Sequence, residues 1–245
     1  MDAITTIEKE GFTGKLYVDD FPESPREWDN LGTMVCFHSN YGLGDKHNYE
    51  DSEVFMYELF VNAIGDSDKA EKLAKKWEDS FDKDNNPVPM YEAYREWLFE
   101  TIEKHYIYLP LYLYNHSGIT MNTTGFSCGR DSGQVGYVYV SKAKIRKVYG
   151  WKNITKKRIA IIEDYLRSKV KTYDEYLRGD IYIVSIENKD GDEIETCGGY
   201  YGQDYAEQGL NFTLDCIVKN KNEKDFPLLI NRGVEIPEYN KAVKN

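Results

Sequence analysis

The residues from Tyr106 to Tyr114 (YIYLPLYLY) are aromatic and aliphatic, and they predict a buried β-strand. Pro110 within this stretch has no N–H to donate to a neighbouring strand, which indicates an edge position or a bulge. The chain continues through a segment rich in Gly, Ser and Thr, residues 115–136, into a second predicted strand from Gln134 to Val140. We expect these strands to belong to one sheet, around which the rest of the chain is arranged.

Upstream of this centre, a helical insertion is expected at about residues 48–105. Capping residues and apolar spacing predict its three helices, which run from Asp51 or Ser52 to Ile64, from Ser67 to Phe81, and from Met90 to His105. Short strands are predicted before the insertion, at Lys15–Val18 and Thr33–His38.

Downstream, Ser141 is expected to cap a short helix to Tyr149, and Thr155 a longer one to about Val170, with a further helical turn at 173–177. A hairpin at 181–187 and 193–200, a helix at 204–218 and a polar tail at 219–245 complete the chain. The pattern is not a regular βαβ alternation. It therefore predicts a single α+β domain, with a mixed or antiparallel sheet, the helical insertion and flanking helices.

The chain of 245 residues has a formal net charge of -11, which argues against binding of DNA by its whole surface. It contains neither a run of about 18 apolar residues nor an N-terminal signal peptide. We therefore expect a protein without a membrane partner that acts in the cytoplasm.

The charge is strongly segregated along the chain. Residues 45–104 and 179–215 are both acidic, whereas residues 141–178 carry twelve basic and four acidic side chains. Basic groups interleaved with aromatic rings could hold a nucleic acid backbone and stack a base. The candidates for this are Lys144, Lys147, Trp151, Lys156 and Lys157. The alternative is a solvated helix face whose cations pair with neighbouring acids.

Carboxylates on the predicted insertion could imitate the phosphates of DNA and occupy a basic groove of a partner. The candidates are Glu71, Glu78, Asp79, Asp82 and Asp84. Four lysines share the segment, so an ordinary surface helix is the alternative.

His116, Cys128 and Asp131 lie close together in the 115–136 segment, and a hydrolase could use them as base, nucleophile and orienting group. The alternative is a structural loop, in which glycines and hydroxyl groups form turns. The four cysteines include no C-x-x-C pair, and the four histidines form no H-E-x-x-H motif. Phosphate-binding glycine motifs are also absent, so we expect neither a metal nor a cofactor.

The stretches PLYLYNHSGITMNTTGFSC and RDSGQVGYVYVSK resemble a group of proteins, without an established activity, encoded by bacteriophages and other mobile elements. The shared pattern is P-L-Y-x-Y-x-H-S-G-x-T, then F-S-C-x-x-D-S-G-Q-V-G and a strand ending in V-S-K. DNLGTMVCFHSNYGLGDKH and the hairpin leading into GGYYGQDY resemble the same group. The region from the first of these stretches to the last spans roughly two thirds of the chain. The commonest central motif has Pro-Trp where this chain has Gly129-Arg130, so a ligand role for that Trp does not carry over.

The resemblance implies a phage or mobile-element accessory protein, and it implies no reaction. We expect such a protein to bind and inhibit a host defence complex of the restriction or CRISPR type by protein–protein interaction. The partner would be a protein or a ribonucleoprotein of the host cytoplasm. A hydrolase using the 115–136 segment and a nucleic-acid-binding protein using residues 141–158 are the alternatives.

Overall fold

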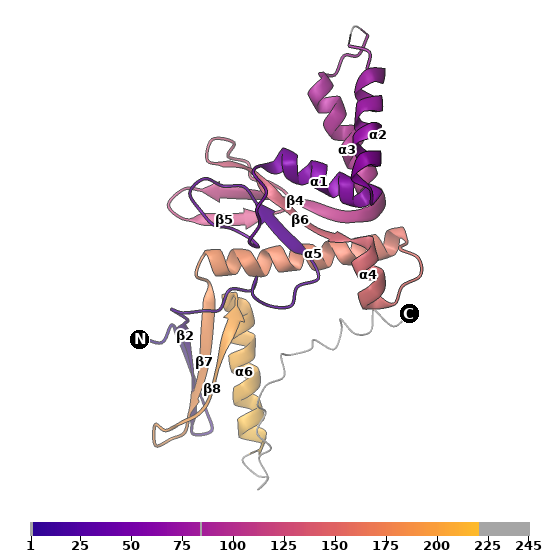
Figure 1. The fold of residues 1–245 in the computed structure, drawn as a ribbon. Helices are drawn as coiled ribbons and strands as arrows, with labels where there is room; N and C mark the ends of the chain where they lie inside the picture. The colour runs from indigo at the N-terminus through magenta and orange to yellow at the C-terminus, as the bar shows by residue number, and fades with distance from the viewer. Residues whose placement is uncertain (1, 84, 221–245) are drawn as a thin grey trace. The chain divides into compact units, whose positions relative to one another are not determined.

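A computed structural model describes residues 2–83 and 85–220, and it confirms the α+β class. This part of the chain forms six helices and two four-stranded antiparallel sheets (Figure 1). The polar tail from residue 221 and the candidate Asp84 lie outside the described residues. In the described part, no helix is both long enough and apolar enough to cross a membrane.

The aromatic stretch from Tyr106 to Tyr114 forms an inner strand of one sheet. Strand β4 (Tyr106–Asn115) pairs with β6 (Ser132–Ser141), and the strand order is β3-β6-β4-β5, with β3 at Thr33–Cys36 and β5 at Ile119–Asn122. Strand β5 reaches β4 only from Tyr112 onward, so Pro110 lies on a stretch of β4 with a free edge. The register also shifts between Leu111 and Tyr112. The edge position expected for Pro110 is therefore confirmed, and the irregularity in the pairing lies after the next residue.

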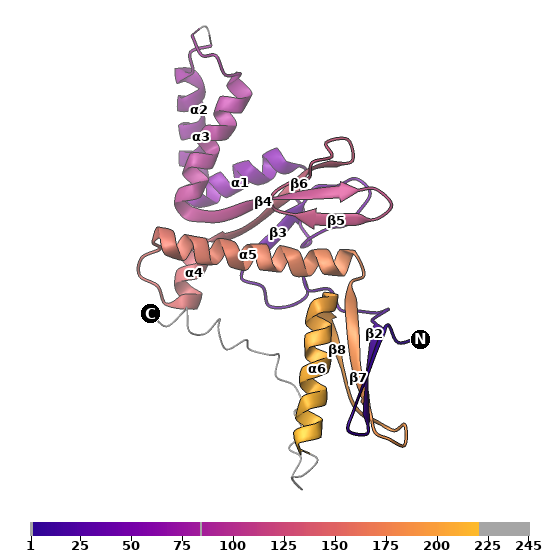
Figure 2. The same cartoon turned by 180° about the vertical axis from the view of Figure 1, so that it is seen from behind.

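The two faces of this sheet carry different side chains. Aliphatic side chains of β4 alternate with tyrosines, and Leu109 and Leu111 pack with helix α5 (Lys156–Leu177) in one core cluster. Tyr108, together with Tyr137 of β6, belongs to a second cluster with Phe55 of helix α1 (Ser52–Ile64) and residues of helix α3 (Met90–His105). Figures 1 and 2 show α5 along one face of the sheet and α1 on the other.

The helices of the insertion begin and end where their caps predict. The side chain of Asp51 accepts hydrogen bonds from the backbone of Glu53 and Val54, and Gly65 ends α1 in the left-handed conformation. Asp66 then caps α2 (Ser67–Ser80). Downstream, α4 is Lys142–Tyr149, and α5 continues without a break through the turn expected at 173–177.

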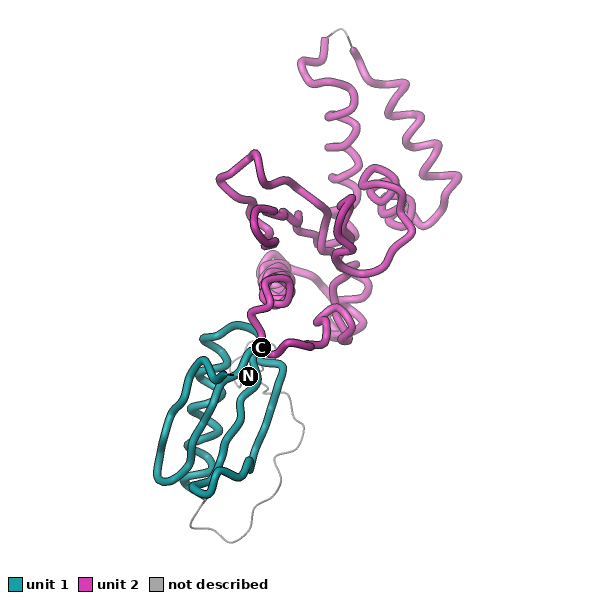
Figure 3. The backbone as a smooth tube through the Cα atoms, turned by 90° about the vertical axis from the view of Figure 1, so that its left-hand side faces the viewer, with its two compact units in different colours: residues 1–18, 182–245 teal, residues 19–181 magenta. Residues whose placement is uncertain are grey.

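The expectation that all strands pair into one sheet is wrong. Strands β1 (Thr5–Lys9), β2 (Phe12–Val18), β7 (Ile181–Glu187) and β8 (Glu193–Tyr201) form a second sheet, on which α6 (Gln203–Asn220) packs. The reason is a long-range pairing of β2 with β7, which buries their apolar side chains against α6. The chain thus divides into two compact units (Figure 3), residues 19–181 and the two terminal segments. Two compact units are two domains only if each folds independently. The single domain therefore stays a prediction.

Candidate functional site

The fold brings His116, Cys128 and Asp131 together beside the end of β4. The Oδ2 atom of Asp131 lies 3.6 Å from Nδ1 of His116 and 3.6 Å from Sγ of Cys128. Asp131 therefore stands between the other two groups. The hydrogen bonds of the described residues include none between His116 and Cys128.

This order of contacts differs from that of a catalytic triad. A triad needs the histidine in contact with the nucleophile, and the carboxylate on the far side of the ring. Here the carboxylate contacts the thiol, the side chain of His116 is 65% exposed, and Cys128 is exposed. The arrangement holds a solvated loop together and does not place the imidazole of His116 against the thiol of Cys128.

Other residues in the stretches that carry the family resemblance hold the sheet and its loops in place. The carboxylate of Asp45 accepts two hydrogen bonds from Arg26, whose side chain is 6% exposed, and one from the backbone of Met34. Gly44, at φ +73°, donates its N–H to the hydroxyl of Tyr173. A Cβ at Gly136 would lie 1.9 Å from the carbonyl oxygen of Val35 on β3. The roles of Asp45, Gly44 and Gly136 in this structure are therefore hydrogen bonding and close packing within the fold.

The acidic candidates do not form a purely acidic face. Glu71, Glu78 and Asp79 are exposed on α2, but this helix carries four lysines beside its four acidic residues. Asp82 follows the helix and accepts hydrogen bonds from Asn85. The surface of α2 is therefore mixed in charge.

The basic candidates separate into two groups. Lys144 donates to the carbonyl of Asn30, and Trp151 is 9% exposed, stacked with Tyr149 and covered by the guanidinium of Arg158. These side chains are used within the fold. The other group is exposed and consists of Lys147, Lys156 and Lys157.

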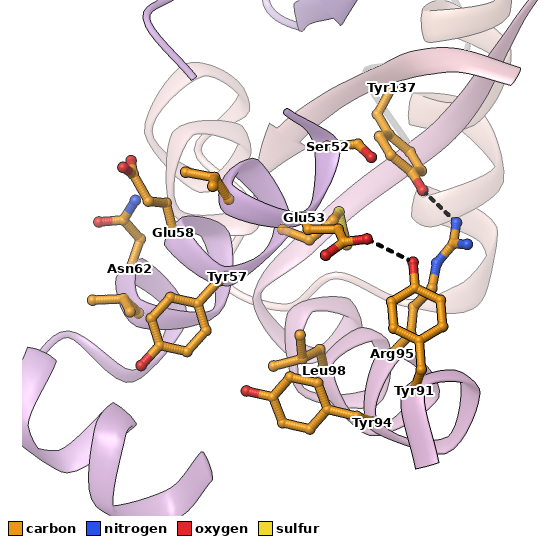
Figure 4. A pocket seen from close by; sticks show the side chains of 13 residues that line it. Ser52, Glu53, Tyr57, Glu58, Asn62, Tyr91, Tyr94, Arg95, Leu98 and Tyr137 are labelled. Atoms are coloured by element: carbon orange, nitrogen blue, oxygen red, sulfur yellow. Dashed lines mark hydrogen bonds between the residues drawn. The ribbon is translucent and has the colours of Figure 1, made fainter. Parts of the chain in front are cut away.

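The structure adds a site that the sequence analysis did not identify, a groove between α1 and α3 with a volume of about 760 Å³ (Figure 4). Its floor includes Tyr137 of β6. The side chains that line its two walls are largely aromatic and aliphatic, with a few charged groups among them. They include Val54, Met56, Tyr57, Glu58 and Val61 of α1, and Tyr91, Tyr94, Arg95 and Leu98 of α3.

Hydrogen bonds fix four of the polar side chains in the groove. The hydroxyl of Tyr91 donates to Glu53 over 3.0 Å, and this bond raises the pKa of Tyr91. Arg95 donates to the hydroxyl of Tyr137 over 2.9 Å and lies over the ring of Phe99. Burial raises the pKa of Tyr94, so this ring presents a neutral aromatic face to the groove.

Glu58 is a charged group of the groove without such a bond in the described part of the chain. It is exposed at the rim, and the hydrogen bonds and ion pairs of the described residues include none from its carboxylate. The charge that the groove offers to a ligand is therefore negative.

Only part of this groove has a signal in the sequence. Tyr94 and Leu98 belong to the apolar stripe of α3 and are naturally interpreted as core residues. Tyr91, Tyr94, Arg95 and Leu98 follow the spacing i, i+3, i+4 and i+7, which places them on one helix face. The partner wall on α1 cannot be inferred from that spacing.

The described residues contain no group of three or more His, Cys, Asp or Glu side chains placed to hold a metal ion. No family model matches the sequence, and neither the curated proteins nor the solved structures that were compared give a match.

Proposed function

We propose that this chain is an accessory protein of a bacteriophage or mobile element that binds a host defence complex in the host cytoplasm and inhibits it. The binding surface in this proposal is the groove between α1 and α3, and its occupant is a basic segment of the partner protein. The observation that carries the proposal is the groove itself, open, lined by four tyrosines and rimmed by the unpaired carboxylate of Glu58.

The lining favours a cationic side chain as the occupant. Tyrosine faces attract Lys ammonium and Arg guanidinium groups, and a nearby carboxylate adds a direct ion pair. Glu53 adds a second negative charge, and the two carboxylates together outweigh the single positive charge of Arg95 in the lining. A basic side chain flanked by apolar residues would meet both the carboxylates and the aromatic walls.

The size and composition of the groove also suit a protein ligand. Ligand pockets commonly measure about 300–1,000 Å³, which accommodates a few side chains of a bound segment. Tyr and Trp are enriched at the centres of protein interfaces, because they bury large areas and retain a polar group. Tyr91 is 55% exposed, so its ring is available to a partner. Imitation of nucleic acid by α2 stays a separate prediction, which this groove does not require.

The test is phage plating on a panel of hosts that each carry one restriction or CRISPR system, with and without expression of this chain. We expect the chain to restore plating on at least one host, and we expect Glu58→Arg to abolish the rescue. Glu100→Arg is the matched control, because it makes the same change on α3, on the side opposite Tyr91 by the 3.6-residue period.

Failure of the chain to rescue plating on any host would contradict the inhibitory function. Rescue by Glu58→Arg at the level of the unchanged protein would contradict the role of the groove. Circular dichroism of each variant shows that the fold is retained.

A further inference from the structure

A group of exposed cations lies where α4 ends and α5 begins. We call it the basic end. It consists of Arg146, Lys147, Lys152, Lys156 and Lys157. Ile145 of α4 and Ile162 of α5 belong to one core cluster with Trp151 of the intervening loop, which fixes the two helices relative to each other. Figures 1 and 2 show α4 beside the first turns of α5.

These cations are not neutralised within the fold. The ion pairs of the described residues include none from residues 142–158. The acids of α5 pair instead with cations farther along the chain, as Glu163 does with Arg167 and Asp174 with Arg178. The alternative of a basic face that pairs with neighbouring acids therefore describes the later turns of α5 and not the basic end.

The neighbouring cations, in contrast, have structural roles. Lys142 donates to the carbonyl of Glu103, and burial lowers its pKa. Lys144 binds the carbonyl of Asn30, and Arg158 binds the carbonyl of Asn153 while covering Trp151. Five cations of the basic end remain available to a ligand.

Their position adds to the positive potential. Lys156 and Lys157 occupy the first turn of α5, which contains no acidic residue. A helix N-terminus carries a partial positive charge, and the two lysines add to this charge. An anion bound at this position would be stabilised by both. The basic end therefore favours a ligand with several closely spaced negative charges.

The chemistry of the basic end favours nucleic acid over an acidic protein. Protein interfaces usually have an apolar or aromatic centre, and here Val148 is the exposed large hydrophobic residue among the five cations. Phosphate groups, in contrast, are neutralised by Lys and Arg and require no apolar centre in the interface. Trp151 is enclosed, so it cannot stack on an unpaired base as single-stranded ligands require.

We propose that the basic end binds the phosphate backbone of double-stranded nucleic acid without reading its sequence. The acidic remainder of the chain, which brings the net charge to -11, repels the same backbone and confines the contact to this end. This proposal is independent of the groove between α1 and α3.

The test is fluorescence anisotropy of a labelled 20-base-pair DNA duplex titrated with the full chain, from about 50 mM salt upward. With four or five phosphates contacted, we expect the logarithm of the affinity to fall with the logarithm of the salt concentration with a slope of about -4. Lys156→Glu combined with Lys157→Glu should weaken binding by more than about tenfold and make the slope shallower. Lys75→Glu combined with Lys76→Glu is the control, because it makes the same charge change on the exposed surface of α2.

Absence of duplex binding at about 50 mM salt would overturn the proposal. Equal losses of duplex affinity in the two double variants would overturn the assignment of the binding site to the basic end. Tighter binding of a single strand of the same length would overturn the assignment of a double-stranded ligand. Binding of polyglutamate in place of DNA would overturn the assignment of nucleic acid and would show that the surface binds an acidic protein.

Discussion

The hydroxyl of Tyr91 on α3 donates a 3.0 Å hydrogen bond to the carboxylate of Glu53 on α1, and this bond joins the two walls of the tyrosine-lined groove. A second bond, from Arg95 to Tyr137, joins α3 to the sheet beneath. The groove is thus held open by contacts between three separate elements. Such preorganisation reduces the entropy that a ligand must lose on binding.

Replacement of Gly136 by alanine should destabilise the sheet strongly. A Cβ at this position would overlap the carbonyl of Val35, so β3 and β6 would have to separate. We expect a loss of about 3 kcal/mol in the free energy of unfolding, measured by urea denaturation. Gly133→Ala on the same strand is the control, because nothing lies within 4 Å of its Cβ position. Equal stabilities of the two variants would refute this packing.

The stability of the protein should fall in alkaline solution, in part because of Cys36. Burial raises the pKa of this thiol from 9.0 to about 12. Below pH 9 the thiol is protonated in both states, whereas above it the unfolded chain loses the proton and the folded chain keeps it. The stabilising contribution of the buried, protonated thiol to the free energy of unfolding is therefore complete below about pH 9, and it is lost as the pH rises toward about 12.

The matched measurement compares the unchanged protein with Cys36→Ala in urea at about pH 8 and about pH 10.5. Buried tyrosines other than Tyr173, whose pKa responds to Cys36, titrate alike in both proteins and cancel in the comparison. The unchanged protein should lose more stability over this interval than the variant. Parallel losses would show that the thiol does not contribute.

Cys128→Ser should leave the rescue of phage plating unchanged. Asp131, and not His116, contacts the thiol, and a carboxylate is a weaker base than an imidazole for activating a nucleophile at this position. His116→Ala should behave in the same way. A folded Cys128→Ser variant that no longer rescues plating would instead support the hydrolase alternative.

The local elements of this fold can be predicted from the sequence because they depend on short-range signals. Asp51, Gly65 and Asp66 set the helix boundaries of the insertion through their own backbone geometry and side chains. The aromatic stretch of β4 likewise predicts its strand, and Pro110 its irregular edge.

The division into two sheets cannot be predicted in this way. It depends on the pairing of Leu16 with Val184, two residues far apart in the chain whose local patterns fit either sheet. Strand β5 is short and lies within a segment rich in turn residues, so its pattern is weak. The pairing of strands is a property of the whole chain.

The candidate sites show the same limit. Proximity in the sequence correctly brings His116, Cys128 and Asp131 together, but the order of their contacts depends on the conformation of the loop. The groove depends on the relative placement of Tyr57 and Tyr94, which come from different helices. The chemical character of a surface follows from the sequence, and its geometry does not.

The most direct measurement of the central claim is photo-crosslinking from the groove in cells that carry the inhibited defence system. A photoreactive phenylalanine analogue replaces Val54, which lines the groove and is 38% exposed, and in a matched protein it replaces Leu73 on α2, which is 41% exposed. We predict that the analogue at position 54 crosslinks a subunit of the defence complex next to a Lys or Arg, and that the analogue at position 73 does not. No crosslink from position 54, or a crosslink to an acidic segment, would contradict the account.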